Sequence, residues 1–270
     1  MRVETIGADS RTESPSVAVV AGIHGDEPCG VHAVEELLAD PPAVSRPVRI
    51  VIANERAVER GVRYVDEDLN RSFPGDPNAE THEGRLAARL SAELAGCTTL
   101  ALHSTRSHPE PFAVVDERTP LADRLVPRLP VVSLVETGTR VEGRIFASVP
   151  RTIEVECGRQ ETPDAAENAE ELVEAFLAAT GVTDESPVGD GDRTDGEPLP
   201  VFRLRERIPK PPASEYAVTG RNFERVERGE AFARADDEML SADEPFYPVL
   251  LSADGYENAF GYVADRVGTL

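Results

Sequence analysis

The chain has few lysines and cysteines, no tryptophan and few methionines, and the shortage of lysine and of cysteine narrows the class of protein to which it can belong. Its 270 residues include one lysine (Lys210), no tryptophan and two methionines. The three cysteines form no C-x-x-C pair and are odd in number, so no disulfide framework is expected and a reducing compartment is favoured. The sequence has no apolar run long enough to cross a bilayer and no N-terminal signal pattern. We therefore expect a cytoplasmic protein with no membrane partner.

Positive charge is scarce as well. The chain has 50 Asp plus Glu against 28 Lys plus Arg, which gives a formal net charge of -22. A surface this acidic repels the phosphates of nucleic acids, so a nucleic-acid partner is not expected. An acidic, lysine-poor chain resembles the proteins of salt-accumulating halophiles, in which concentrated salt screens the repulsion between carboxylates. The alternative is an acidic protein from an organism that does not accumulate salt.

Strand-like and helix-like segments alternate through the first two thirds of the chain. Helical spacing of apolar residues predicts helices at residues 27–38, 83–94 and 165–179. Short apolar runs predict strands at residues 17–21, 48–53, 99–102, 112–115, 131–135 and 152–155. This alternation predicts an α/β sandwich with a mixed, largely parallel sheet.

The composition changes after Gly181. Residues 182–200 are rich in Asp, Gly, Pro, Ser and Thr, which predicts a linker or a long surface loop. A period-two pattern at 201–208 and apolar segments at 246–251 and 261–263 predict further strands. We therefore predict an α/β domain at 1–181, a linker at 182–199 and a small β-rich domain at 200–270.

Two histidines and a glutamate are candidate metal ligands. His24 and Glu27 form an H-x-x-E motif directly after the predicted strand 17–21, and His103 follows the predicted strand 99–102. The carboxyl ends of parallel strands share one edge of a sheet, so we expect the three side chains to meet there. Imidazole nitrogen and carboxylate oxygen are ordinary zinc donors, and three protein ligands leave one position open for chemistry.

Simpler structural roles stay open for these residues, because H-x-x-E alone is a weak motif. Glu27 could complement the dipole of the following helix, and His103 could be a hydrogen-bonded histidine under a loop. The remaining histidines fit a metal site less well, because His32 lies inside a predicted helix and His82 and His108 lie in polar loops.

The segment between these motifs carries groups suited to an anionic substrate. Arg63, Asn70 and Arg71 offer two guanidinium forks and one amide, and Arg pairs bidentately with carboxylates. Asp68 could orient one of these groups. The alternative is a charged surface loop with incidental arginines.

Three motifs in this order resemble the succinylglutamate desuccinylase/aspartoacylase family of the zinc carboxypeptidase-like superfamily. They are Gly-Ile-His-Gly-Asp-Glu at 22–27, Arg-Tyr-Val-Asp-Glu-Asp-Leu-Asn-Arg-Ser-Phe at 63–73 and Leu-His-Ser-Thr at 102–105. The resemblance implies a zinc-carboxypeptidase-like sandwich and a small C-terminal domain that caps the active site. It also implies one zinc ion per chain, with His24, Glu27 and His103 as its ligands.

The resemblance assigns roles to further residues. Arg63 would polarise the scissile carbonyl or hold the acyl group, while Asn70 and Arg71 would bind the substrate carboxylate. A catalytic glutamate is expected in Thr-Ile-Glu-Val-Glu-Cys-Gly at 152–158. The family pattern Glu-x-Gly selects Glu156, whereas counting without gaps back to Pro150 and Arg144 favours Glu154. We prefer Glu156, because the carboxylate should emerge where the strand ends.

Two further positions bear on the resemblance. Tyr256 matches the tyrosine that reaches the active site of aspartoacylases from the β domain, although a core or rim tyrosine is an alternative. Ala101 stands where relatives often carry an acidic residue two positions before the histidine. Some support of the metal ligands is therefore expected from elsewhere.

These observations predict a zinc-dependent hydrolase that cleaves the amide bond of a small anionic N-acyl amino acid, with water activated by the metal and Glu156 as general base. One alternative is a zinc carboxypeptidase acting on peptides, and another is a non-catalytic metal-containing binding protein. A serine hydrolase is not supported, because the sequence has no G-x-S-x-G motif. The acyl group, the amino acid and the oligomeric state stay open, and a homo-oligomer is compatible with the sequence.

Overall fold

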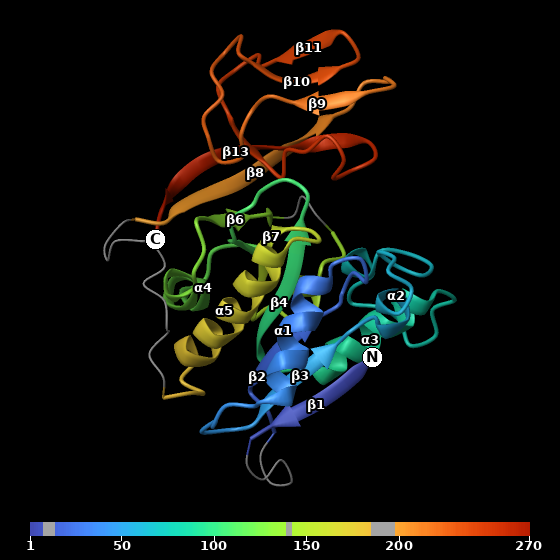
Figure 1. The fold of residues 1–270 in the computed structure, drawn as a ribbon, viewed down its shortest axis with the longest axis vertical. Helices are drawn as coiled ribbons and strands as arrows, with labels where there is room; N and C mark the ends of the chain where they lie inside the picture. The colour runs from blue at the N-terminus through green and yellow to red at the C-terminus, as the bar shows by residue number, and fades with distance from the viewer. Residues whose placement is uncertain (8–13, 139–141, 185–197) are drawn as a thin grey trace.

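The computed structural model describes residues 1–7, 14–138, 142–184 and 198–270 (Figure 1). Within these residues, ten strands form one large mixed sheet and three strands form a separate antiparallel sheet. The large sheet has the spatial order β1 (Arg2–Ile6), β3 (Val48–Ile52), β2 (Val17–Ala21), β4 (Thr98–Thr105), β7 (Thr152–Arg159), β5 (Phe112–Val115), β6 (Leu134–Glu136), β8 (Pro200–Pro209), β13 (Ala259–Thr269) and β12 (Tyr247–Val249). The predicted α/β sandwich with a mixed sheet is confirmed.

Helices cover both faces of the part of the sheet that contains β2, β3 and β4 (Figure 1). On one face lie α1 (Pro28–Ala39) and α5 (Pro163–Ala179), and on the other lies α3 (His82–Glu93). In β2, Val17, Val19 and Ala21 pack with the first face, whereas Ala18 and Val20 pack with the second. This two-sided burial explains why β2 is a continuous apolar run rather than an alternating one.

Local sequence signals define where these helices begin. Thr81 caps α3 by accepting a hydrogen bond from the amide of Gly84, and Thr162 caps α5, which begins at Pro163. The short helices α2 (Glu55–Val58) and α4 (Pro120–Leu125) are capped by Asn54 and Thr119. The carboxylate of Glu27, which precedes α1, makes no capping hydrogen bond and is therefore available for other contacts.

Several strands differ in their bounds from the sequence prediction; β7 and β13, for example, are longer than the predicted 152–155 and 261–263. β4 extends to Thr105, so His103 lies inside the strand rather than after it. The cause is pairing with β7, because His103 and Glu156 occupy directly opposite register positions. The strand predicted at 131–135 begins later, at Leu134, because residues 129–131 form a turn in which the amide of Val131 donates to the carbonyl of Leu129.

The C-terminal region continues the large sheet. β8 pairs in parallel with β6 and antiparallel with β13, which in turn pairs with β12. The three-stranded sheet, β11 (Glu238–Ser241), β10 (Ala231–Ala235) and β9 (Tyr216–Val218), lies beyond β8 and β13 at the end of the molecule away from β1 (Figure 1). The predicted division at 181 and 200 stays a prediction, and most of the predicted linker, 185–197, lies outside the described residues.

Candidate active site

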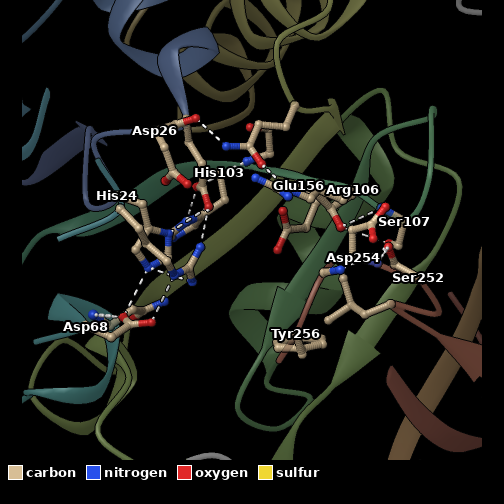
Figure 2. Close-up of a pocket in the computed structure, with 18 of the residues that line it drawn as sticks. His24, Asp26, Asp68, His103, Arg106, Ser107, Glu156, Ser252, Asp254 and Tyr256 are labelled. Carbon is tan, nitrogen blue, oxygen red and sulfur yellow. Dashed lines mark hydrogen bonds and ion pairs between the residues drawn. The ribbon is translucent and has the colours of Figure 1, made fainter. Parts of the chain in front are cut away.

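The three candidate metal ligands meet at the carboxyl edge of the parallel strands. His24 and Glu27 lie in the connection between β2 and α1, and His103 lies near the end of β4. All three are buried, and their candidate ligand atoms lie within 4.8 Å of one another. The sheet therefore brings together residues that are 76 positions apart in the sequence (Figure 2).

The carboxylate of Glu27 joins the two imidazoles. Its Oε1 lies 2.8 Å from Nδ1 of His24, and its Oε2 lies 2.9 Å from Nδ1 of His103. Two nitrogens and a carboxylate thus converge on one point, which is the donor set of a zinc site with three protein ligands. Glu27 acts here as a partner of the histidines, so the interpretation that it serves only the helix dipole is not supported.

The imidazole nitrogens that face away from this point have acidic neighbours. Nε2 of His24 lies 3.1 Å from Oδ1 of Asp68, and Nε2 of His103 lies 3.8 Å from Oε1 of Glu154. Glu154 lies opposite Ala101 in the register of β7 and β4. Glu154 is thus an acidic neighbour of His103 on the adjacent strand, but the distance is longer than a hydrogen bond, and Nε2 of His103 has no hydrogen-bond partner among the described residues.

Asp68 also holds Arg63 against the ligands. Nε of Arg63 donates to Asp68 (3.2 Å), and Nη1 donates to Oε1 of Glu27 (3.1 Å). Burial opposes ionisation of Asp68, but its hydrogen bond to His24 and the charges around it outweigh burial and hold its pKa well below the usual range. The geometry places a cation beside the candidate metal site, as the role predicted for Arg63 requires.

The two candidate bases on β7 have different surroundings. Glu154 is 1% exposed, accepts a hydrogen bond from Nδ2 of Asn70 (2.8 Å) and forms an ion pair with Arg144. Glu156 lines the cavity, and its Oε2 is buried without a hydrogen-bond partner among the described residues. Burial raises the pKa of Glu156. The geometry favours Glu156 as the base, because Glu154 is already engaged.

Asn70 and Arg71 also differ in how many of their hydrogen-bonding groups are available to a substrate. The side chain of Asn70 is 2% exposed and is used at both ends, since Nδ2 donates to Glu154 and Oδ1 accepts from the amide of Ile145 (3.0 Å). Arg71 is exposed and lines the cavity, and within the described residues its side chain makes one hydrogen bond, from Nη1 to the carbonyl oxygen of Asn70 (2.6 Å). Arg71 is thus the freer of the two for a substrate carboxylate, and the binding role of Asn70 stays a prediction.

The cavity at these residues has a volume of about 730 Å³ and is lined from both ends of the chain. Ser252, Asp254 and Tyr256 lie across it from His24 and Asp68 (Figure 2). The position predicted for Tyr256 is therefore at the cavity. Burial raises the pKa of the Tyr256 hydroxyl well above its usual value, and neighbouring Tyr262 adds to this effect.

Three arginines of the cavity were not predicted as site residues: Arg106, Arg144 and Arg207. Burial and the charge of Arg71 lower the pKa of Arg144 to about 10, which still leaves it a cation at neutral pH. The guanidinium of Arg207 lies 5.8 Å from the ring centre of Tyr256. The sequence offered one signal for Arg144, its spacing from Glu154, whereas Arg106 and Arg207 are identified only by the fold.

The fold and the cavity define the class: a mixed α/β protein with a His-Glu-His cluster that could hold a metal ion at the carboxyl edge of its sheet. Residues 13–180, more than half of the chain, match the family model described as the succinylglutamate desuccinylase/aspartoacylase catalytic domain. The chain belongs to this family.

Sequence relatives agree with this assignment over short segments. An N-acyl-aromatic-L-amino acid amidohydrolase (carboxylate-forming) of Xenopus tropicalis is 48% identical over 60 residues, which are 21% of this chain and 19% of the relative. A succinylglutamate desuccinylase of Burkholderia thailandensis is 36% identical over 98 residues, which are 34% of this chain and 28% of the relative. The chain thus matches less than a third of the length of each of these two relatives.

A solved structure supports the fold over nearly the whole chain. The succinylglutamate desuccinylase/aspartoacylase of Rhodobacter sphaeroides superposes with a TM-score of 0.77 at 19% identity and covers 98% of this chain and 89% of its own. At this identity the likeness concerns the fold alone. Among the described residues, no helix combines the length and apolar character needed to span a membrane.

Proposed function

We propose that the protein is a zinc-dependent hydrolase that cleaves the amide bond of small anionic N-acyl amino acids. The observation that carries the proposal is a buried carboxylate oxygen of Glu156, on the strand next to His103, that has no hydrogen-bond partner in the part of the chain that the structure describes. It lies in a cavity whose lining includes the three candidate ligands and several guanidinium groups. The names of the two sequence relatives, an amidohydrolase of N-acyl amino acids and a desuccinylase, support the same reaction class.

The residues divide the reaction between them. A zinc ion held by His24, Glu27 and His103 would supply a Lewis acid for the scissile carbonyl and lower the pKa of a water beside it. Glu156 accepts the proton of the attacking water and passes it to the departing amine. Arg63, fixed by Asp68, donates to the carbonyl oxygen as negative charge develops there.

Substrate orientation comes from cations farther from the scissile bond. Arg71 offers a guanidinium fork that matches a carboxylate, and it lies in the same cavity as Glu156. Holding the carboxylate there orients the amide toward the candidate metal site. A cavity of about 730 Å³ that is also lined by C-terminal residues favours a small substrate over a peptide chain.

The direct test compares Glu156→Gln with the wild type on a panel of N-succinyl- and N-acetyl-amino acids in molar potassium chloride with added zinc. We expect kcat to fall by about 100-fold or more, the range of a lost general base, with the zinc content unchanged. Glu174→Gln is the matched control, because it removes the same charge from an exposed position on α5.

Each result separates the alternatives. A kcat retained in Glu156→Gln and lost in Glu154→Gln would transfer the base to Glu154. Release of C-terminal residues from peptides at a higher kcat/KM than from any N-acyl amino acid would favour a carboxypeptidase. A zinc-loaded wild type that binds these compounds without turnover would be a binding protein.

A further inference from the structure

The only lysine of the chain lies behind the cavity wall. Lys210 directly follows β8, and its ammonium donates to the carbonyl oxygens of Ala253 and Tyr256, both at 2.6 Å. Nζ also lies 4.8 Å from the ring centre of Tyr216 and 5.7 Å from that of Phe260. Two carbonyl dipoles and two aromatic faces therefore surround one cation, and each of them favours positive charge.

The two carbonyls belong to a segment that forms part of the cavity. We call residues 253–256 the wall segment; three of its members, Asp254, Gly255 and Tyr256, line the cavity. Inside it, the amides of Asp254 and Gly255 both donate to Oγ of Ser252 at 3.1 Å. Lys210 donates hydrogen bonds to the first and last residues of the wall segment, so its ammonium holds both ends of this turn.

The chemistry of the contact explains a lysine in a chain that otherwise uses arginine. The sequence holds 28 Lys plus Arg, of which one is lysine. An ammonium is a compact charge with three donors and can satisfy two carbonyls that converge on one point while it touches ring faces. A planar guanidinium directs its donors in a fixed fork and is a wider group than an ammonium, so it is not an equivalent replacement.

We propose that Lys210 is a positioning residue that holds the wall segment, and through it Tyr256, at the distance from Glu156 that substrate binding requires. Lys210 does not line the cavity, so it acts through the wall segment rather than on the substrate. The effect on substrate affinity rests on the function proposed above, whereas the effect on the wall segment does not.

The first test measures the wall segment without any substrate. Hydrogen exchange of the amides of Asp254 and Gly255 should become at least about tenfold faster in Lys210→Met, because the loss of one charge-assisted hydrogen bond corresponds to about that factor and the variant loses two. Exchange in β4 and β7 should stay at the wild-type rate. Arg228→Met is the control, since it removes a cation from an exposed position outside the cavity lining.

The second test is kinetic. In Lys210→Met we expect KM to rise about tenfold while kcat changes less than about threefold, because the catalytic groups stay in place. Lys210→Arg keeps the charge but not the shape of the ammonium, so its KM should also be raised, to nearly the value of Lys210→Met.

Three outcomes would overturn the proposal: unchanged exchange in the wall segment, faster exchange spread evenly over the whole chain, or a wild-type KM in both variants. If the wild type turns over no N-acyl amino acid, the proposed function fails, and the exchange result alone decides whether Lys210 holds the wall segment.

Discussion

Glu83 is a buried carboxylate outside the candidate metal site whose removal should be costly. It lies in the first turn of α3 and is 0% exposed. Oε1 accepts from the amide of Val65 (2.7 Å) and from Nδ2 of Asn54 (2.9 Å). Oε2 accepts from the amides of Asp66 (3.0 Å) and Glu67 (3.3 Å). Glu83 therefore holds the segment that connects Arg63 with Asp68.

The magnitude for Glu83→Gln follows from these four hydrogen bonds. Glutamine replaces one carboxylate oxygen with an NH2 group, so two of the four donors lose their acceptor and face another donor. Each buried donor left without a partner costs about 1–3 kcal/mol, which gives a loss of about 2–6 kcal/mol in the free energy of unfolding. Arg63 and Asp68 should also shift, because the segment between them loosens, and kcat/KM should fall.

The sign of the pH dependence is fixed by the same contacts. Burial opposes ionisation of Glu83, but the hydrogen bonds from Val65, Asn54 and Asp66 outweigh it and lower its pKa below the usual 4.5. A lowered pKa adds stability that is present above about pH 4.5 and is lost as the pH falls through the folded-state value. The difference in unfolding free energy between the wild type and Glu83→Gln should therefore shrink on acidification.

Urea denaturation at several pH values measures this difference, together with kcat/KM at pH 7. Glu80→Gln is the control, because Glu80 is exposed and lies three residues before Glu83. A Glu83→Gln variant within about 0.5 kcal/mol of the wild type, the range of ordinary surface substitutions, would refute the reasoning.

Two further predictions concern substrate charge and salt. Arg71→Lys should raise KM for acidic substrates about tenfold with little change in kcat, because a point charge cannot replace the bidentate fork; steady-state kinetics that give an unchanged KM would remove Arg71 from carboxylate binding. With a net charge of -22, the thermal midpoint should rise from dilute buffer to molar potassium chloride, since the Debye length falls from about 30 Å at 0.01 M to about 3 Å at 1 M. A midpoint that stays flat or falls in a thermal melt would show that the acidic composition is not an adaptation to salt.

The sequence predicted best where one local signal dominated. The strands at 17–21 and 112–115 match β2 and β5, because a short continuous apolar run that is buried on both faces has clear ends. β1 was not predicted, because only Ile6 of its five residues is buried and the segment carries no apolar run. The pairing of β6 with β8 was not predictable either, because it joins segments 67 positions apart, as Leu134 and Val201 show.

In the candidate site, too, the residues with a clear local signal in the sequence were predicted and the others were not. His24, Glu27 and His103 were identified from their places beside strands, and the structure brings them together. The choice between Glu154 and Glu156 needed the partners of each carboxylate, because both point to the same face of β7. Arg106 and Arg207 come from different parts of the chain, and only the three-dimensional fold assigns them to one cavity.

The most direct test of the central claim is the rate of amine release from N-acyl amino acids at defined zinc content. The protein is stripped with a chelator, and the rate is measured before and after one equivalent of zinc is added, for the wild type and for His103→Ala. We predict that stripped wild-type protein is inactive and regains its rate with one equivalent of zinc, whereas His103→Ala neither retains the metal nor recovers. Full activity of the stripped protein, or stoichiometric zinc in His103→Ala, would contradict the account.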